Sequence, residues 1–235
     1  MIRTVDETGS TNADMLVLAA AGAADGMWLR AERQTAGRGR HGRDWASPAG
    51  NLYASTLVRL APNDPPAATL ALVTAVALHQ TVAAYLPADA ACAQIKWPND
   101  LLIAGVKLAG ILLERVSDAV VIGIGTNLAH HPVDLDRPAT SLAAHGVSVA
   151  PHDFVETLVG ALAGWVARWR SEGLAPVRTH WLSAAHPPGT ALRVQLPGET
   201  PLEGVFGGLE ASGALILRLA DGATRVIHAG DVFLL

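Results

Sequence analysis

The alternation of hydrophobic and polar positions divides the chain into many short apolar runs and a few longer helical patterns. The short runs predict strands at residues 2–5, 27–33, 52–60, 93–97, 101–104, 108–115 and 119–127. The longer patterns predict helices at residues 13–21, 67–86 and 153–170. In the last of these, large apolar side chains recur every three or four positions, which marks one buried helix face. Strands interleaved with helices indicate a mixed α/β (α+β) fold.

The pattern changes after about Pro187. Short alternating runs at residues 191–196, 215–219 and 224–227 are separated by Pro-Gly, Gly-Gly, Ser-Gly and Asp-Gly turns, which is typical of a small all-β unit. We therefore expect two domains, residues 1–186 and 187–235. The second is too small to be an independent enzyme.

Composition and charge narrow the class of protein. Half of the 235 residues are hydrophobic, 16% are charged and the formal net charge is −4, which suits a well-buried core and argues against a nucleic-acid partner. The longest apolar stretch, residues 67–86, is alanine-rich, contains several polar residues and follows two prolines, so it favours a buried helix over a membrane span. We expect no membrane association.

A single cysteine, Cys92, excludes an internal disulfide and fits a reducing cytoplasm, and the N-terminus shows no signal peptide pattern. In its alanine-rich segment, Cys92 is expected to be a small buried residue. The four histidines at positions 130, 131, 145 and 152 lack a convincing metal-ligand spacing and lie in or near predicted loop, including residues 130–137.

Lysine is rare in this chain. Lys96 and Lys107 stand eleven positions apart, against fifteen arginines elsewhere. A site that needs a compact point charge against a phosphate or carboxylate takes lysine in preference to the planar arginine fork. Chance placement in a biased composition is the alternative.

A glycine- and arginine-rich loop follows the second predicted strand. Its glycines allow close backbone approach to a ligand, Arg38, Arg40 and Arg43 offer donors to anions, and Trp45 ends it. Because its arginines repel one another, we expect the free loop to be mobile and an anionic ligand to order it. An ordinary solvated loop and an RGG-like nucleic-acid segment are the alternatives.

Three short polar motifs accompany this loop. Asn99-Asp100 would be ordinary turn chemistry, but Lys107 across the same predicted hairpin suggests a magnesium–triphosphate site. Residues 123–127 (Gly-Ile-Gly-Thr-Asn) lack the third glycine of a dinucleotide fingerprint, yet indicate close backbone approach and an adenine-reading amide. Residues 10–12 (Ser-Thr-Asn) are explained by a helix cap alone, and Glu114 reads as a solvated strand end.

In their order and spacing, these segments resemble the biotin protein ligases, enzymes that adenylate biotin and attach it to a carrier protein. The resemblance covers nearly the whole chain and is carried by residues 10–12, 34–45, 96–100, 107–114 and 123–127. It implies a mixed-sheet ligase catalytic domain of the biotin/lipoate ligase type, followed by a small SH3-like β-barrel.

The resemblance also implies roles for individual residues. The biotin-binding residues would be Ser10, Thr11, Asn12, Gln34, Arg38, Gly39, Arg40, Lys107 and Gly110. The residues binding ATP or the adenylate would be Arg38, Arg40, Arg43, Trp45, Asn99, Lys107 and Asn127, with Trp45 stacked on adenine and Asn127 on its edge. The catalytic residues would be Lys107, Arg40 and Asp100, with Lys107 stabilising charge and Asp100 a candidate proton acceptor. Mg²⁺ is expected with ATP, near Asn99 and Asp100.

The chain departs from the family pattern at His41 and Asp44, where relatives often have basic residues. Because the first motif begins at Ser10, we expect no N-terminal winged-helix domain and hence a ligase without repressor function. The expected partners are biotin, ATP and the biotin carboxyl carrier protein of acetyl-CoA carboxylase, and a homodimer is possible.

The alternatives differ in class. A lipoate or octanoate ligase or transferase resembles this catalytic core, but the arginine-rich loop with Trp45 and the small β domain favour biotin. A non-catalytic biotin or nucleotide sensor would use the same cavity without chemistry. ATP-dependent pyrophosphate release separates these cases.

Overall fold

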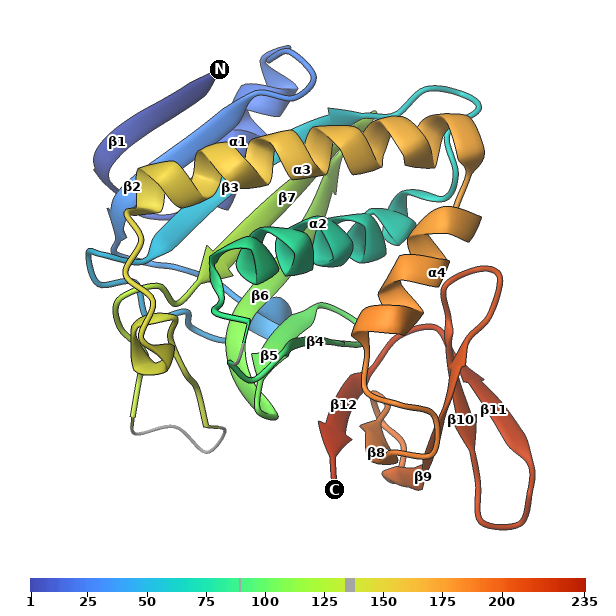
Figure 1. The fold of residues 1–235 in the computed structure, drawn as a ribbon. Coiled ribbons are helices and arrows are strands. Elements are labelled where there is room, and N and C mark those ends of the chain that lie inside the picture. The colour runs from blue at the N-terminus through green and yellow to red at the C-terminus, as the bar shows by residue number, and fades with distance from the viewer. Residues whose placement is uncertain (89, 134–137) are drawn as a thin grey trace.

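A seven-stranded mixed sheet forms the body of the molecule in the computed structural model, which describes residues 1–88, 90–133 and 138–235 (Figure 1). Its strands are β1 (Ile2–Thr8), β2 (Trp28–Gln34), β3 (Leu52–Arg59), β4 (Ala93–Lys96), β5 (Asp100–Ile103), β6 (Val106–Val116) and β7 (Ala119–Thr126). They lie in the order β1-β2-β3-β7-β6-β5-β4. β1 and β2 are parallel and the other neighbours are antiparallel.

Helices cover both faces of this sheet. The helical elements are α1 (Thr11–Ala20), η1 (Arg40–Gly42), η2 (Ala67–Thr69), α2 (Leu70–Tyr85), η3 (Ala143–His145), α3 (Pro151–Glu172) and α4 (Ala175–Ala184). Met15 and Ala19 of α1 pack with Leu57 and Val121 on one face, whereas α2 and α3 join the larger core on the other. β3 is therefore buried on both faces, as its nearly unbroken apolar run predicts.

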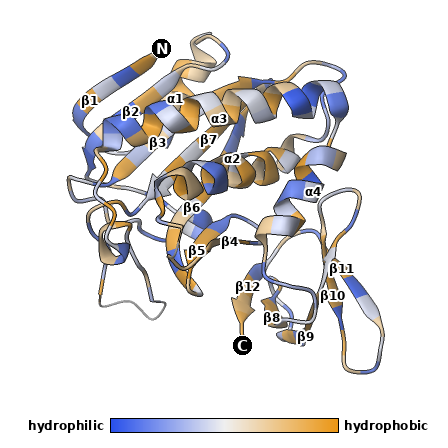
Figure 2. Cartoon of the chain, in the orientation of Figure 1, coloured by the Kyte–Doolittle hydropathy of each residue, from blue (hydrophilic) through white to orange (hydrophobic). Residues whose placement is uncertain are grey.

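Helix α2 is apolar around most of its circumference (Figure 2). The segment Ala67–Tyr85 is long and apolar enough to cross a membrane by length and composition alone, but 61% of it is buried within the protein. It lies between α3, α4 and the sheet, where a helix without a polar face finds apolar neighbours on several sides. This position explains its composition as that of a core helix.

The C-terminal part is a five-stranded antiparallel sheet in the order β11-β10-β9-β8-β12. Its strands are β8 (Ala191–Gln195), β9 (Leu202–Leu209), β10 (Leu215–Arg218), β11 (Thr224–Ile227) and β12 (Asp231–Leu234). Trp181 of α4 packs on Phe206 of β9 with ring centroids 6.2 Å apart, and residues of both sheets belong to one apolar cluster. The antiparallel β unit is confirmed, and its boundary at residues 186/187 stays a prediction.

The strands and helices expected from periodicity are all present, with bounds that differ by a few residues. Ala104 and Gly105 both have positive φ, which confirms the hairpin turn between β5 and β6. Helix α4 and strands β9 and β12 were not predicted. A proline in its first turn hides α4, and three glycines interrupt β9.

Two predictions concern single segments, the burial of Cys92 and the loop at residues 130–137. Cys92 is exposed, so its prediction as a buried residue was wrong, because it and its neighbour Ala91 lie at the surface just before β4. Of the loop predicted at residues 130–137, positions 134–137 lie outside the described residues.

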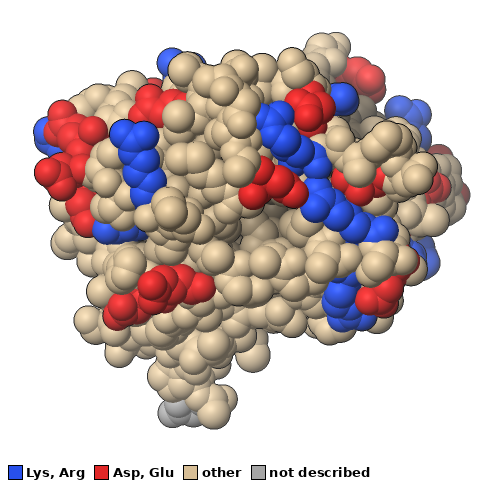
Figure 3. All heavy atoms as spheres, turned by 90° about the horizontal axis from the view of Figure 1, so that it is seen from above, with Lys and Arg blue, Asp and Glu red and all other residues tan. Residues whose placement is uncertain are grey.

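Basic and acidic side chains are interspersed over the described part of the face in Figure 3.

Candidate active site

A cavity of about 1070 Å³ opens between the large sheet, the loop after β2 and the C-terminal strand β12. The structure brings every residue that the sequence predicted for a ligand or catalysis to this cavity. They are Ser10, Thr11, Asn12, Gln34, Arg38, Gly39, Arg40, Arg43, Trp45, Asn99, Asp100, Lys107, Gly110 and Asn127. Residues up to 117 positions apart in the chain therefore share one site, and their individual roles stay predictions.

A pair of glycines on adjacent strands shapes one wall of the cavity. Gly110 of β6 and Gly125 of β7 are directly paired, and the Trp45 indole lies against both. A Cβ atom at Gly125 would come within 2.6 Å of Trp45 Cε2. The close approach that glycine permits is thus used by a side chain of the protein itself.

Trp45 is an unusual lining residue because its polar atom is unsatisfied. The indole Nε1 is buried and has no hydrogen-bond partner among the described residues. Lys107 Nζ lies 5.4 Å from the ring centroid, within the range of a cation–π contact. An unpaired buried N–H costs free energy, which a ligand that accepts this hydrogen bond or moves the ring would recover.

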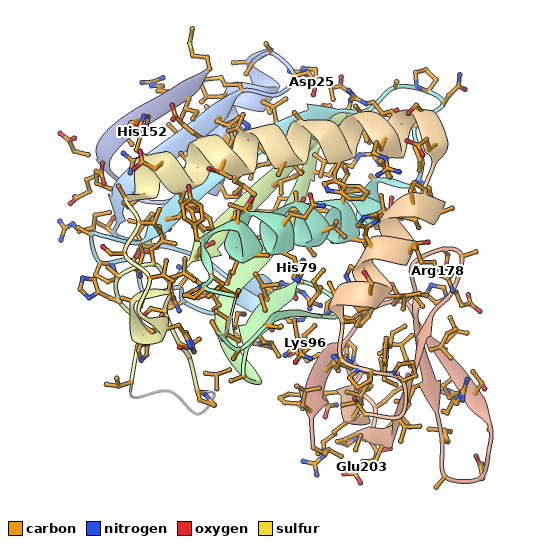
Figure 4. All side chains as sticks on the ribbon, viewed as in Figure 1. Asp25, His79, Lys96, His152, Arg178 and Glu203 are labelled. Carbon is orange, nitrogen blue, oxygen red and sulfur yellow. The ribbon has the colours of Figure 1, made fainter. Side chains whose placement is uncertain are left out.

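The two lysines meet at one carboxylate. Lys107 Nζ lies 2.6 Å from Asp100 Oδ1, and Lys96 Nζ lies 3.0 Å from Asp100 Oδ2. Burial alone would raise the pKa of Asp100, but Lys107 and Lys96 outweigh it and hold that pKa below its ordinary value. Lys96 also donates to the carbonyl of Val232, so it joins the large sheet to β12 at the place labelled in Figure 4. Lys107 is thereby held with its charge at the cavity.

This arrangement changes the interpretation of Asp100. With its pKa lowered and each oxygen facing an ammonium group, its carboxylate is a poor proton acceptor. Asn99 is also occupied, since its Oδ1 accepts from Arg40 at 3.2 Å and its Nδ2 donates to the Ile111 carbonyl at 2.6 Å. As arranged here, the pair does not fit a magnesium site, because two lysines would repel the cation.

The arginine-rich loop is anchored by a residue that the sequence analysis did not single out. Asp231, the first residue of β12, pairs with Arg43, and lies 3.7 Å from both Arg40 and the His41 ring. Arg40 Nη2 also donates to the Gly230 carbonyl at 3.3 Å. Burial would raise the pKa of Asp231, but these cations, Arg43 first, lower it. The loop's mutual repulsion, expected to make it mobile, is here offset by one carboxylate from the C-terminal sheet.

The Ser-Thr-Asn motif at the start of α1 is more than a helix cap. Ser10 occupies the N-cap position, but no side chain there caps the helix. Instead, Gln34 Oε1 accepts from the Thr11 backbone N–H at 2.9 Å, and Asn12 Nδ2 donates to Glu114 at 2.7 Å. Glu114 is half-buried, so it is only partly solvated, and the bond from Asn12 was not predicted.

Asn127 lies at the end of β7, where the sequence predicts it. Its side-chain Nδ2 donates to the Thr140 carbonyl at 3.0 Å, and the residue is buried. One of its amide hydrogens is therefore already bonded within the protein. The structure leaves less of this amide for a bidentate contact with an adenine edge than the sequence alone suggests.

Comparisons with known proteins point to one family and together cover nearly the whole chain. A model of the biotin/lipoate A/B protein ligase family matches residues 20–127, and a model of the biotin protein ligase C-terminal domain matches residues 191–235. A biotin–[acetyl-CoA-carboxylase] ligase of Paracoccus denitrificans is 39% identical over 96% of this chain and 97% of its own length. A protein of the same name from Mycobacterium tuberculosis is 39% identical over 97% of this chain and 86% of its own.

The fold has a close structural counterpart. A biotin protein ligase of Aquifex aeolicus, solved in complex with biotin and ATP, aligns over 100% of this chain and 99% of its own with a TM-score of 0.88. Its sequence identity to this chain is 23%, so this likeness concerns the fold.

Proposed function

This chain belongs to the biotin protein ligase family, and from that premise we propose that it activates biotin with ATP and transfers it to a carrier-protein lysine. The proposed acceptor is the biotin carboxyl carrier protein of acetyl-CoA carboxylase, the enzyme in the names of the relatives. The observation that carries the proposal is one cavity lined by a neutral polar set of side chains and a cationic set. Thr11 and Gln34, which are bonded to each other, form what we call the neutral end, and Lys107 and Arg40 form the cationic end.

The neutral end suits the ring of biotin. Thr11, Gln34 and Ser55 supply hydroxyl and amide groups that are partly bonded to one another, which fixes their orientation before a ligand arrives. A cyclic urea carries both N–H donors and a carbonyl acceptor, so it can complete such a set. Pre-oriented groups lower the entropic cost of binding.

The cationic end suits the first chemical step. An oxygen of the biotin carboxylate attacks the α-phosphorus of ATP, the bond to pyrophosphate breaks, and the mixed anhydride biotinyl-5′-AMP remains. Lys107, held by Asp100, and Arg40, held by Asn99, place fixed positive charge where negative charge develops. Closing the loop that carries Trp45 over the anhydride would keep it from water.

The second step makes an amide. The carrier lysine loses a proton, its nitrogen attacks the acyl carbon, and AMP leaves. An ordinary lysine has a pKa of about 10.4, so deprotonation near neutral pH needs either an acceptor or solvent. Asp100 is unsuited to accept the proton for the reasons above, and the reactivity of the anhydride carries this step.

We also propose that Mg²⁺ accompanies ATP, bound through the triphosphate. The ion pairs of Asp100 argue against Asn99 and Asp100 as its protein ligands in this arrangement. No step above passes through the metal. The cytoplasmic location and a possible homodimer remain predictions from the sequence.

The test is pyrophosphate release from ATP with biotin, and with lipoate or octanoate as the competing substrate. We expect release with biotin alone. Release driven by lipoate or octanoate would overturn the substrate assignment and leave a ligase of the same family. Binding of biotin or ATP without release would indicate the non-catalytic sensor instead.

A further inference from the structure

A chain of side-chain hydrogen bonds runs through the layer between α1 and the large sheet. It begins at the half-buried Glu114 on β6, whose Oε2 accepts from Asn12 Nδ2 at 2.7 Å. Asn12 Oδ1 accepts from the Ser55 hydroxyl at 2.9 Å, and Ser55 Oγ lies 2.8 Å from Thr11 Oγ1. Asn12, Ser55 and Thr11 are each 5% exposed or less, and Thr11 lines the cavity. These hydrogen bonds therefore link a half-buried carboxylate on β6 to the binding site.

The chemistry of Glu114 sets the direction of every bond in this chain. A carboxylate can only accept, so Asn12 must turn its NH₂ group toward Glu114 and its carbonyl oxygen toward Ser55. Ser55 has one hydroxyl proton and gives it to Asn12. The 2.8 Å contact between Ser55 and Thr11 then needs the proton of Thr11.

The Thr11 hydroxyl is consequently left with lone pairs alone for any further partner. Gln34 Oε1, 3.2 Å away, is a second acceptor for the same proton, and it already accepts from the Thr11 backbone N–H. Whichever of the two takes the proton, none remains for a ligand. The hydroxyl at the cavity wall can accept a hydrogen bond and cannot donate one.

Gly123 provides independent support that this series of hydrogen bonds is built into the fold. It lies in the interior of β7, where glycine weakens a strand, and its φ is not positive, so the backbone conformation does not require glycine. A Cβ atom there would come within 2.5 Å of Asn12 Oδ1 and 2.9 Å of Asn12 Cγ. Glycine at this position gives the Asn12 amide its place between Glu114 and Ser55.

We propose that Glu114 is a positioning residue for ligand recognition, which acts through Asn12 and Ser55 to present Thr11 as an obligatory hydrogen-bond acceptor. The matching ligand head must donate an N–H. This inference rests on the proposed function, because the ureido ring of biotin has such donors. The dithiolane of lipoate and the alkyl chain of octanoate have none, so a site of this polarity discriminates against them.

The experiment measures whether the site prefers a hydrogen-bond donor on the ligand, separately from how tightly it binds the ligand. Biotin and the two analogues in which ring oxygen replaces one or the other ureido N–H are titrated calorimetrically into the full-length protein without ATP. The decisive quantity is the ratio of dissociation constants, carbamate analogue over biotin, for the analogue that the wild type binds less well.

Three variants are compared with the wild type. Glu114→Lys replaces an acceptor by a donor, so Asn12 is expected to turn over and Ser55 then donates to Thr11, which uses one of the lone pairs that Thr11 otherwise offers to a ligand. Glu114→Gln keeps an oxygen that Asn12 can bond, and serves as the conservative rescue. Glu199→Lys makes the same charge change at an exposed site in the loop between β8 and β9. Thermal unfolding of each variant checks that it is folded.

We expect Glu114→Lys to reduce the wild-type ratio by about tenfold, the value of one directed hydrogen bond. Glu114→Gln should change it by less than about threefold, and Glu199→Lys should leave it unchanged. A ratio that Glu114→Lys leaves at the wild-type value, even with weaker binding of all three compounds, would show a merely structural role and overturn the inference. Wild-type protein that binds no biotin would instead defeat the proposed function.

Discussion

Two glycines on β7, two positions apart, lie against side chains that differ in whether their polar atoms are hydrogen-bonded. Gly123 lies under Asn12, whose amide is buried and bonded to Glu114 and Ser55. Gly125 lies under Trp45, whose indole N–H is buried without a partner among the described residues and whose chain segment is a loop. The same glycine chemistry thus makes room for one side chain that is fixed and one that a ligand can displace. Completeness of hydrogen bonding, rather than burial, distinguishes the two.

The largest effect is expected next to Trp45, at Lys107, whose Nζ lies 5.4 Å from the centroid of the Trp45 ring. Replacing Lys107 with alanine should slow biotin-dependent pyrophosphate release by about 10²–10³-fold, because fixed charge at a developing anion is worth that much. Lys96→Ala is the matched control, since it removes the other ammonium on Asp100. Single-turnover release with saturating ATP and biotin is the measurement. Equal losses in both variants would contradict a special role for Lys107.

A second unsatisfied ring nitrogen shows that an orphan atom alone does not mark a ligand site. His186 is buried against Phe206 with ring centroids 4.5 Å apart, and its Nε2 has no partner among the described residues. Burial, with a smaller contribution from Lys96, lowers the pKa of His186 to about 4. In the unfolded chain this pKa is about 6.5.

The fold therefore excludes a proton that the unfolded chain binds between these two values. Above about pH 6.5, His186 should not lower the free energy of unfolding. As the pH drops from there toward 4, the free energy of unfolding should fall by at most about 3 kcal/mol. His186→Phe should remove this slope, and the urea midpoint measured across the range tests it. Exposed His152 supplies the control as His152→Gln, which should leave the slope as it is. An unchanged slope in His186→Phe would show that His186 is not its source.

Adding one methyl group at either glycine tests whether Asn12 is fixed and Trp45 is displaceable. Gly123→Ala should lower the free energy of unfolding by about 1–3 kcal/mol, because Asn12 is held by its bonds and cannot move aside. Gly125→Ala should cost less, because the Trp45 loop can shift, and it should weaken formation of the adenylate instead. Urea unfolding and pyrophosphate release measure the two outcomes. The reverse order of stabilities would contradict the distinction between fixed and displaceable side chains.

The smallest effect is expected where the loop is anchored. Asp231→Asn removes the carboxylate that faces Arg43, Arg40 and His41, so the KM for ATP should rise about threefold with little change in biotin affinity. Glu203→Gln is the control, because Glu203 lies on β9 (Figure 4) and is not among the residues that line the cavity. The effect should shrink at high salt because these groups are partly exposed. An unchanged KM would mean that the ion pairs do not position the loop.

Local patterns in the sequence were enough to determine most elements of the fold. Apolar runs and helical periodicity placed nearly every strand and helix, because burial on a sheet or helix face imposes a repeat that single residues carry. The elements that escaped had weak repeats: α4 begins with proline, β9 is interrupted by glycine, and β12 has four residues. The predicted site residues also come together at one cavity, and their roles there stay predictions.

Partnerships across the chain were decided by the tertiary structure alone. Lys96 and Lys107 stand close to Asp100 in the sequence, but only the pairing of the strands tells that its carboxylate is held by both. Nothing near Glu114 indicates that it orients Thr11 across 103 positions. Asp231 reaches a loop 188 positions earlier. Sequence specifies which groups can donate, accept or carry charge. Which of them meet, and hence which protons and charges remain for a ligand, depends on how distant strands are brought side by side.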